Sequence, residues 1–107
     1  MKTYIKITTD GRKELLQFED PTAEYHILST AVGGFIEMVP SVFEDHHIYL
    51  NEEGKLKGLT VNGLATELAR GLSVFDMIVG DVVIAGPLDD EGNHDSVTSA
   101  VIKEMGL

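Results

Sequence analysis

The sequence predicts an α+β fold, a mostly antiparallel sheet of about five strands with two or three short helices on one face. Hairpin signals near the start, apolar residues at helical spacing and scattered apolar strands indicate this class. The chain has 107 residues, which suits a single domain spanning residues 1–107. We find no internal repeat, linker or low-complexity tract in it.

The first third of the chain predicts a hairpin and then a helix. Residues 3–8 (TYIKIT) alternate in polarity, residues 10–11 (Asp-Gly) are typical of a hairpin turn, and residues 13–19 supply the return strand. A helix follows over residues 20–33. Its Asp-Pro start fits an N-cap and first helical position, and the Gly-Gly pair at its end stops it.

Two further strands and a turn occupy the middle of the chain. Residues 34–39 and 46–50 are apolar enough for strands, and Pro40 separates them. The polar segment 51–55 (NEEGK) is typical of a turn, in which Gly54 can adopt a positive φ without steric cost.

A helix, a central strand and a last helix complete the predicted fold. Apolar residues at helical spacing from Val61 to Leu68 indicate a helix, capped by Thr60 or Asn62 and stopped by Gly71. Residues 81–87 form an apolar strand without alternation, which predicts a central place in the sheet. Residues 96–105 carry apolar side chains at four-residue spacing, which predicts a short final helix.

The charge balance excludes some partners. Eight basic residues stand against eighteen acidic ones, and the formal net charge is −10. This field repels nucleic acid and anionic membranes, so we expect binding to neither. The negative charge could attract basic proteins, or it simply keeps the protein soluble.

The sequence has no sign of export or of a membrane span. There is no cysteine, residues 1–14 lack the apolar core of a signal peptide, and no apolar run reaches membrane-span length. We therefore expect a cytoplasmic protein.

The sequence contains no recognisable catalytic or metal-binding motif. His46 and His47 are adjacent, so a strand would point them in opposite directions, and His26 and His94 lie far from them in the sequence. We therefore expect exposed imidazoles at strand ends for the histidines, and no shared metal ion. The acidic loop at residues 88–95 does not match a calcium-binding loop, and no phosphate-binding glycine motif or nucleophile signature is present. We expect no catalytic residue, no metal and no cofactor. An enzyme that acts on nucleotides through Glu37, Glu52 and a divalent ion remains an alternative.

Three segments taken in order resemble a known family. They are residues 32–40 (VGGFIEMVP), 49–62 (YLNEEGKLKGLTVN) and 78–86 (IVGDVVIAG), of which the second is the most specific. They resemble a family of small proteins of undefined function, found mostly in phages, plasmids and other mobile elements. The family often has a proline before the later asparagine, where this chain has residues 60–61 (Thr-Val). The resemblance implies a mobile-element accessory protein in a bacterial host, rather than a particular chemistry.

The carboxylate of Glu37 raises the question of a binding site, because it interrupts an apolar strand between Phe35 and Val39. Pairing of the two middle strands would bring it to the 51–55 turn. Carboxylates for ribose hydroxyls, an aromatic ring for stacking and an amide for a base edge suit a nucleotide-derived ligand. The predicted ligand-binding residues are Gly34, Phe35, Glu37, Tyr49, Asn51, Glu52, Lys55 and Asn62. Alternatively, Glu37 pairs with Lys55 or Lys57 in an exposed bridge worth ~0–1 kcal/mol.

Two hypotheses about function follow. The first is a non-enzymatic accessory protein that binds and sequesters a small nucleotide-derived signal of host defence. The second is an acidic interaction module that inhibits a host nucleic-acid-binding or defence protein. We expect a homodimer or larger homo-oligomer, since small domains commonly assemble symmetrically. We also expect Glu37→Ala and Asn62→Ala to abolish ligand capture while changing the unfolding free energy by less than ~1 kcal/mol.

Overall fold

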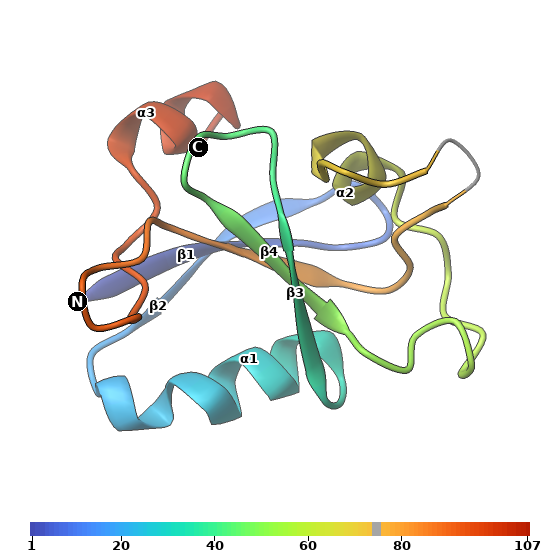
Figure 1. The fold of residues 1–107 in the computed structure, drawn as a ribbon, viewed down its shortest axis with the longest axis horizontal. Coiled ribbons are helices and arrows are strands. Elements are labelled where there is room, and N and C mark those ends of the chain that lie inside the picture. Colours follow the sequence, from blue (N-terminus) through green and yellow to red (C-terminus); the bar gives the residue numbers. More distant parts are fainter. Residues whose placement is uncertain (74–75) are drawn as a thin grey trace.

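The computed structural model describes residues 1–73 and 76–107. Within these residues five strands form one antiparallel sheet in the order β2-β1-β5-β4-β3, accompanied by three α-helices (Figure 1). This confirms the predicted α+β class. The elements are β1 (Lys2–Ile7), β2 (Lys13–Phe18), a 3-10 turn (Pro21–Ala23), α1 (Glu24–Val32), β3 (Ile36–Pro40), β4 (His47–Asn51), α2 (Gly63–Leu68), β5 (Val82–Ala85) and α3 (Ser99–Glu104).

Local signals place the hairpin and the first helix where the sequence predicts them. Gly11 adopts a φ of 84° in the turn between β1 and β2. The Asp20 carboxylate accepts a hydrogen bond from the Thr22 amide at 2.9 Å, and this cap starts the helical segment. Gly33 ends α1 in the left-handed conformation, with a φ of 81°. These predictions are confirmed.

The central strand β5 is buried on both of its faces. On one side of the sheet, the Tyr4 hydroxyl of β1 donates a hydrogen bond to Glu24 of α1. On the other side, Lys13 of β2 has its ammonium close to Gly106, just beyond α3. Helix α1 therefore covers one face, and α2 and α3 cover the other (Figure 1). This differs from the predicted single covered face, because a strand that is apolar on both sides needs cover on both.

Strand β3 forms one edge of the sheet and begins later than predicted. The Gly34 amide donates to the Ser29 carbonyl at 3.0 Å, so Gly34 still belongs to the end of α1. At the other end of the strand, the Pro40 carbonyl accepts from the Arg70 amide at 2.9 Å. This contact ties the end of β3 to the segment that follows α2.

Helices α2 and α3 are shorter than the sequence predicts. Val61 lies outside α2, where it forms an isolated bridge with Val79. The N-terminus of α3 is delayed to Ser99 because the preceding segment is held by β1: the Val97 amide donates to the Thr3 carbonyl at 2.9 Å. Contacts with distant strands thus override the local helical spacing at both sites.

Candidate functional site

A cavity of about 150 Å³ opens beside the edge of the sheet, and we call it the Glu37 cavity. Strands β3 and β4 supply one wall, the turn after β4 a second, and the segment before β5 a third. Among the described residues it is lined by Glu37, Val39, Leu50, Asn51, Glu52, Lys55, Leu56, Leu72, Asp76, Met77, Ile78 and Val79. The structure thus brings the Glu37 carboxylate and the predicted 51–55 turn together around one cavity.

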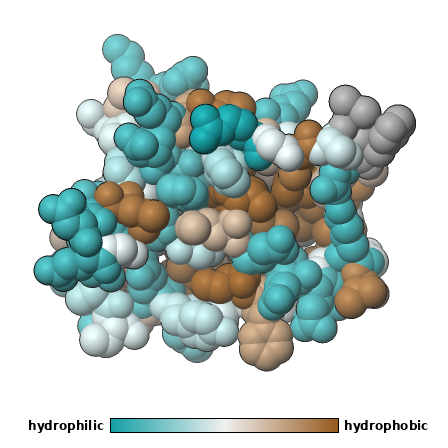
Figure 2. Space-filling model, in the orientation of Figure 1, coloured by the Kyte–Doolittle hydropathy of each residue, from teal (hydrophilic) through white to brown (hydrophobic). Residues whose placement is uncertain are grey.

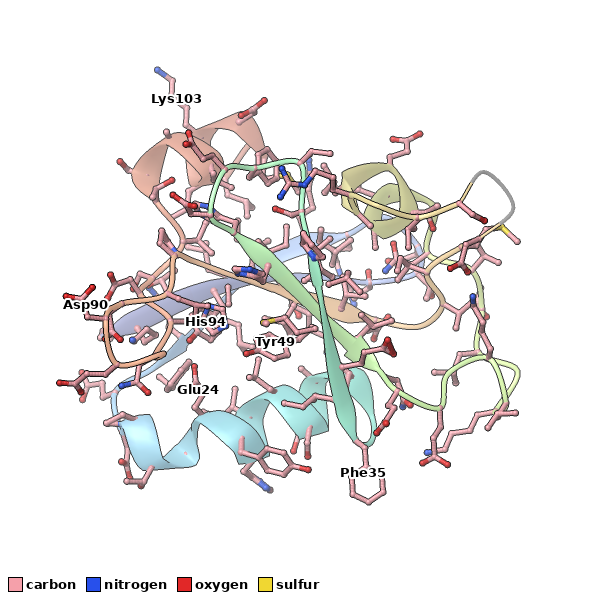
Figure 3. The ribbon with its side chains drawn as sticks, viewed as in Figure 1. Glu24, Phe35, Tyr49, Asp90, His94 and Lys103 are labelled. Atoms are coloured by element: carbon pink, nitrogen blue, oxygen red, sulfur yellow. The ribbon has the colours of Figure 1, made fainter. Side chains whose placement is uncertain are left out.

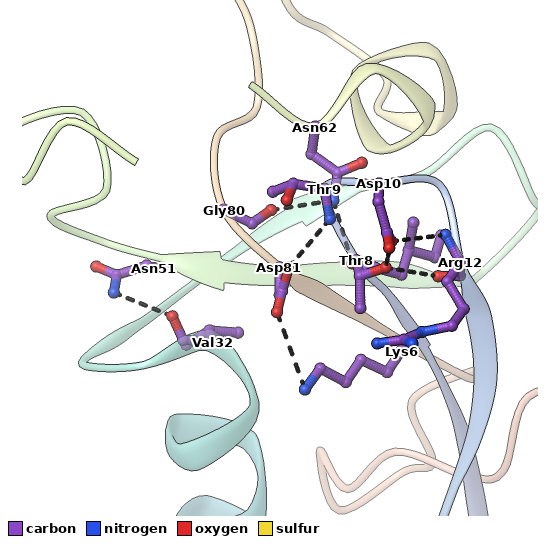
Figure 4. Close-up of polar contacts among 11 residues, drawn as sticks. Lys6, Thr8, Thr9, Asp10, Arg12, Val32, Asn51, Asn62, Gly80 and Asp81 are labelled. Atoms are coloured by element: carbon purple, nitrogen blue, oxygen red, sulfur yellow. Dashed lines mark hydrogen bonds and ion pairs between the residues drawn. The ribbon is translucent and has the colours of Figure 1, made fainter. Parts of the chain in front are cut away.

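Backbone contacts build the turn that closes this cavity. The Asn51 side chain accepts from the Glu53 amide at 2.8 Å and donates to the Val32 carbonyl at 3.1 Å (Figure 4). This side chain is buried and both of its polar atoms bond to the backbone, so Asn51 shapes the turn that lines the cavity. Gly54 is required for close packing, since a Cβ there would lie 2.8 Å from Cγ2 of Val79. Gly54 does not use the positive φ that is open to it, and Gly58 adopts one instead, with a φ of 68°.

The cavity is rich in carboxylates. Glu37 and Glu52 are exposed, so both can accept hydrogen bonds from a ligand. The Lys55 ammonium forms an ion pair with Asp76 across the opening, and its hydrogen bond lowers the pKa of Asp76. In the described part of the chain Glu37 forms no ion pair, so the alternative pairing with Lys55 or Lys57 is not seen, and Lys55 pairs with Asp76. The site therefore favours groups that donate hydrogen bonds and disfavours anions.

Gly34 and Phe35 lie beside the turn. A Cβ on Gly34 would stand 2.9 Å from the Asn51 amide nitrogen and 3.2 Å from the Lys57 ammonium, so the backbone approaches both closely. The Phe35 carbonyl accepts from the Glu52 amide at 2.9 Å. The Phe35 ring is 62% exposed and projects away from the body of the protein (Figure 3). Neither residue lines the cavity, although the Phe35 backbone holds the turn in place.

Tyr49 faces the opposite side of the sheet from Glu37, because Glu37 pairs with Leu50 and side chains alternate along a strand. The Tyr49 hydroxyl lies 2.8 Å from Nε2 of His94, and Nδ1 of His94 lies 2.7 Å from the Gly86 carbonyl (Figure 3). A carbonyl only accepts, so Nδ1 carries the proton and the Tyr49 hydroxyl donates to Nε2. Burial raises the pKa of Tyr49. Sequence reasoning missed this pair, since no local signal links residues so far apart in the chain.

The histidines are more buried than predicted. His46 and His94 are each only 4% exposed, so the expectation of exposed imidazoles is wrong for both. The His47 ring lies 5.4 Å from the His94 ring, and its buried Nδ1 has no hydrogen-bond partner among the residues that the structure describes. Burial lowers the pKa of His47, and the neighbouring His94 and His46 rings lower it further. Within residues 1–73 and 76–107 no three acidic or histidine side chains are placed to hold a metal ion.

Asn62 is fully buried and lies away from the Glu37 cavity. Its side-chain oxygen accepts from the Ala65 amide at 3.0 Å, which caps α2. Its side-chain nitrogen donates to the Ile7 carbonyl at 3.1 Å and to the Gly80 carbonyl at 3.0 Å (Figure 4). Asn62 therefore joins α2 to the end of β1 and to the residues before β5, a structural role that leaves no free group for a ligand.

None of the described helices combines the length and the apolar character that crossing a bilayer requires.

No curated protein and no solved structure matches the chain. A family model, in contrast, matches residues 1–106, which include the strand, the turn and the cavity described above. The chain belongs to the family described as a domain of unknown function, DUF3846.

Proposed function

We propose that this protein binds a small nucleotide-derived molecule in the Glu37 cavity and sequesters it without altering it. The observation that carries the proposal is the convergence of Glu37 with Glu52 and Lys55 of the turn around one hollow. Polar groups that converge on a partly apolar concavity are typical of small-molecule sites.

The chemistry of the cavity favours the nucleoside part of such a molecule. The carboxylates of Glu37 and Glu52 can accept hydrogen bonds from ribose hydroxyls or from an exocyclic amine. Val39, Leu50 and Ile78 offer an apolar wall for the face of a ring. A cavity of about 150 Å³ is smaller than the ~300–1,000 Å³ of typical ligand sites, so only a fragment of a nucleotide would enter. Phosphates would stay outside the cavity, because Lys55 is already paired with Asp76.

Sequestration asks only for tight binding, so it needs no group that stabilises a transition state. The setting within the proposal is a phage or plasmid accessory protein that captures a host-defence signal in the bacterial cytoplasm. That setting rests on the sequence resemblance. A homodimer or larger assembly is part of the same proposal, and sedimentation analysis of the pure protein tests it.

The experiment is ligand capture followed by release. The protein is incubated with a nucleotide extract of bacterial cells, washed and heat-denatured, and the released compounds are identified by mass spectrometry. An intact nucleotide-derived compound supports the proposal. An altered compound indicates an enzyme, and no compound at all contradicts the proposal.

Matched variants locate the binding site. Glu37→Gln and Glu52→Gln keep the side-chain shape and remove the charge, and each should weaken capture about tenfold, as expected for a charged hydrogen bond worth ~1.5 kcal/mol. Glu67→Gln is the control, since Glu67 is exposed on α2 and does not line the cavity. Equal capture by all three variants would exclude the Glu37 cavity as the site.

A second candidate function is an acidic interaction module, and the loop after β5 favours it. The Asp89 carboxylate accepts from the Glu91 and Asn93 amides at 2.9 Å each, and Asp89, Asp90 and Glu91 are all exposed. The net charge of −10 would attract a basic partner. Such binding should weaken steeply as salt rises, because exposed charges are screened within ~8–10 Å near physiological ionic strength.

A further inference from the structure

The outer edge of β3 carries unpaired backbone groups, and the hydrogen-bond pattern identifies them. The Glu52 amide donates to the Phe35 carbonyl at 2.9 Å, and the Ser41 amide donates to the His46 carbonyl at 3.1 Å. In an antiparallel pair the residues that bond to the neighbouring strand alternate with residues that face away. Residues 35, 37, 39 and 41 therefore bond to β4, and Ile36, Met38 and Pro40 face outward.

Pro40 closes one end of this open edge. It has no N–H, and its carbonyl accepts from the Arg70 amide at 2.9 Å. In the described part of the chain, no backbone hydrogen bond from outside the β3–β4 pair reaches Ile36 or Met38. These two residues thus offer two N–H groups and two carbonyls along a short stretch of strand.

The side chains around this edge are mostly apolar. Phe35 is 62% exposed, Met38 43% and Val42 53%. Hydrophobic atoms gather at the centre of the face on which β3 crosses in front, and hydrophilic atoms surround them (Figure 2). Edge strands of monomeric proteins are usually protected by charged side chains or covering loops. On β3 the single charged side chain is Glu37.

We propose that this edge binds an extended, basic segment of a partner protein, which adds to the sheet as a sixth strand beside β3. An antiparallel segment can exchange four hydrogen bonds with Ile36 and Met38, as in recognition by strand addition. The segment's residue opposite Glu37 then sits in a non-hydrogen-bonded position, with its Cα about 4.5 Å from that of Glu37. A lysine or arginine there faces the Glu37 carboxylate, and opposite charges across strands are stabilising.

Charge argues against a second copy of this chain as the occupant. The register that uses all four free groups pairs Ile36 with Met38 of the other copy, and this places Glu37 opposite Glu37. Each copy also brings a net charge of −10. A basic segment satisfies the same backbone groups and gains from both charges.

The inference is independent of the proposed small-molecule site, because it rests on backbone groups that face away from β4. The probe is a seven-residue peptide that alternates lysine and valine, with a glutamate-valine peptide as its counterpart. Fluorescence anisotropy at low salt measures the affinity of each. We expect the lysine peptide to bind at least tenfold more tightly than the glutamate peptide.

Met38→Pro removes one outward N–H and leaves the β3–β4 hydrogen bonds intact, which an edge strand tolerates. It should weaken binding of the lysine peptide at least tenfold. Leu15→Pro is the matched control on β2, the opposite edge of the sheet. The Thr8 amide donates to the Arg12 carbonyl, so the even-numbered residues of β2 bond to β1 and the Leu15 N–H faces outward. It should leave binding unchanged. Glu37→Lys should reverse the preference between the two peptides.

Several outcomes would overturn the inference: no binding of the lysine peptide, equal binding of both peptides, or equal loss in the Met38 and Leu15 variants. Dimerisation of the wild-type chain that Met38→Pro abolishes would assign the edge to a second copy. A lysine peptide N-methylated at the amides facing β3 provides a test that does not depend on a variant's folding, and it should fail to bind. Nucleoside capture should be unaffected by Met38→Pro, so failure of one proposal is distinguishable from failure of the other.

Discussion

Asn62→Ala should destabilise the protein far more than the loss of an ordinary helix cap. The side chain makes three hydrogen bonds in a fully buried position, to Ala65 at 3.0 Å, Ile7 at 3.1 Å and Gly80 at 3.0 Å. Loss of the cap costs about 1 kcal/mol. Each buried carbonyl that loses its donor costs roughly 1–2 kcal/mol more. The expected total is about 3–5 kcal/mol, a large part of the ~5–15 kcal/mol that holds a typical domain folded.

Urea unfolding followed by far-ultraviolet circular dichroism measures this loss. With a slope of ~2 kcal/mol per molar urea, the midpoint should fall by roughly 1.5 M or more. Thr98→Ala is the control, because the Thr98 hydroxyl caps α3 through a single, partly buried 3.4 Å bond from the Val101 amide. If Asn62→Ala lowers the unfolding free energy no more than Thr98→Ala does, the buried hydrogen bonds from Asn62 to the Ile7 and Gly80 carbonyls contribute nothing. The structural role assigned to Asn62 is then refuted. The sequence alone leads to the opposite expectation of a change below ~1 kcal/mol.

Three other changes test the structure. A methyl group on Gly86 would lie 2.1 Å from the Ser96 backbone oxygen, so Gly86→Ala should lower the melting temperature sharply. At Gly63 a methyl group would meet no described atom within 4 Å, so Gly63→Ala should be neutral or stabilising. Because the pKa of His47 is lowered in the folded protein, the unfolded chain takes up a proton first as the pH falls below about 6.5. The unfolding free energy should therefore decline there by at most ~1.4 kcal/mol per pH unit. In urea titrations His47→Gln should flatten this decline. Lys55→Ala should return the pKa of Asp76 towards 3.8, as followed by carbon NMR; an unchanged pKa would show that the ion pair does not persist in solution.

Much of the fold is predictable because its signals are local. The cap at Asp20, the glycine stop at Gly33 and the Asp-Gly turn each act within a few residues. The placement of α1 on one face of the sheet and of α2 and α3 on the other depends on how the chain passes from strand to strand, and no local sequence pattern predicts that. The apolar run of β5 did contain a clue, since a strand without alternation is buried on both faces.

In the candidate site, too, the features set by local sequence patterns were predictable and those set by tertiary contacts were not. The position of Glu37 beside the turn follows from strand pairing and alternation, both of which the sequence indicates. Asn62 was a candidate both for the helix cap and for ligand binding, and only tertiary contacts separate these roles. The hydrogen bond between Tyr49 and His94 could not be predicted, because it depends on how the loop after β5 brings His94 back onto the sheet. That loop has no regular sequence pattern.

Glu37 links the two proposals, because its side chain lines the cavity on an edge strand whose backbone is open at the residues on either side. A lysine from an added strand and a hydroxyl from a nucleoside would both seek this one carboxylate. Binding at the edge and in the cavity should therefore compete, and by thermodynamic reciprocity each ligand must weaken the other by the same factor. Because Met38→Pro removes only the edge, it should abolish this competition while leaving the cavity's own affinity as it was. Competition that persists in that variant would mean that the peptide occupies the cavity itself.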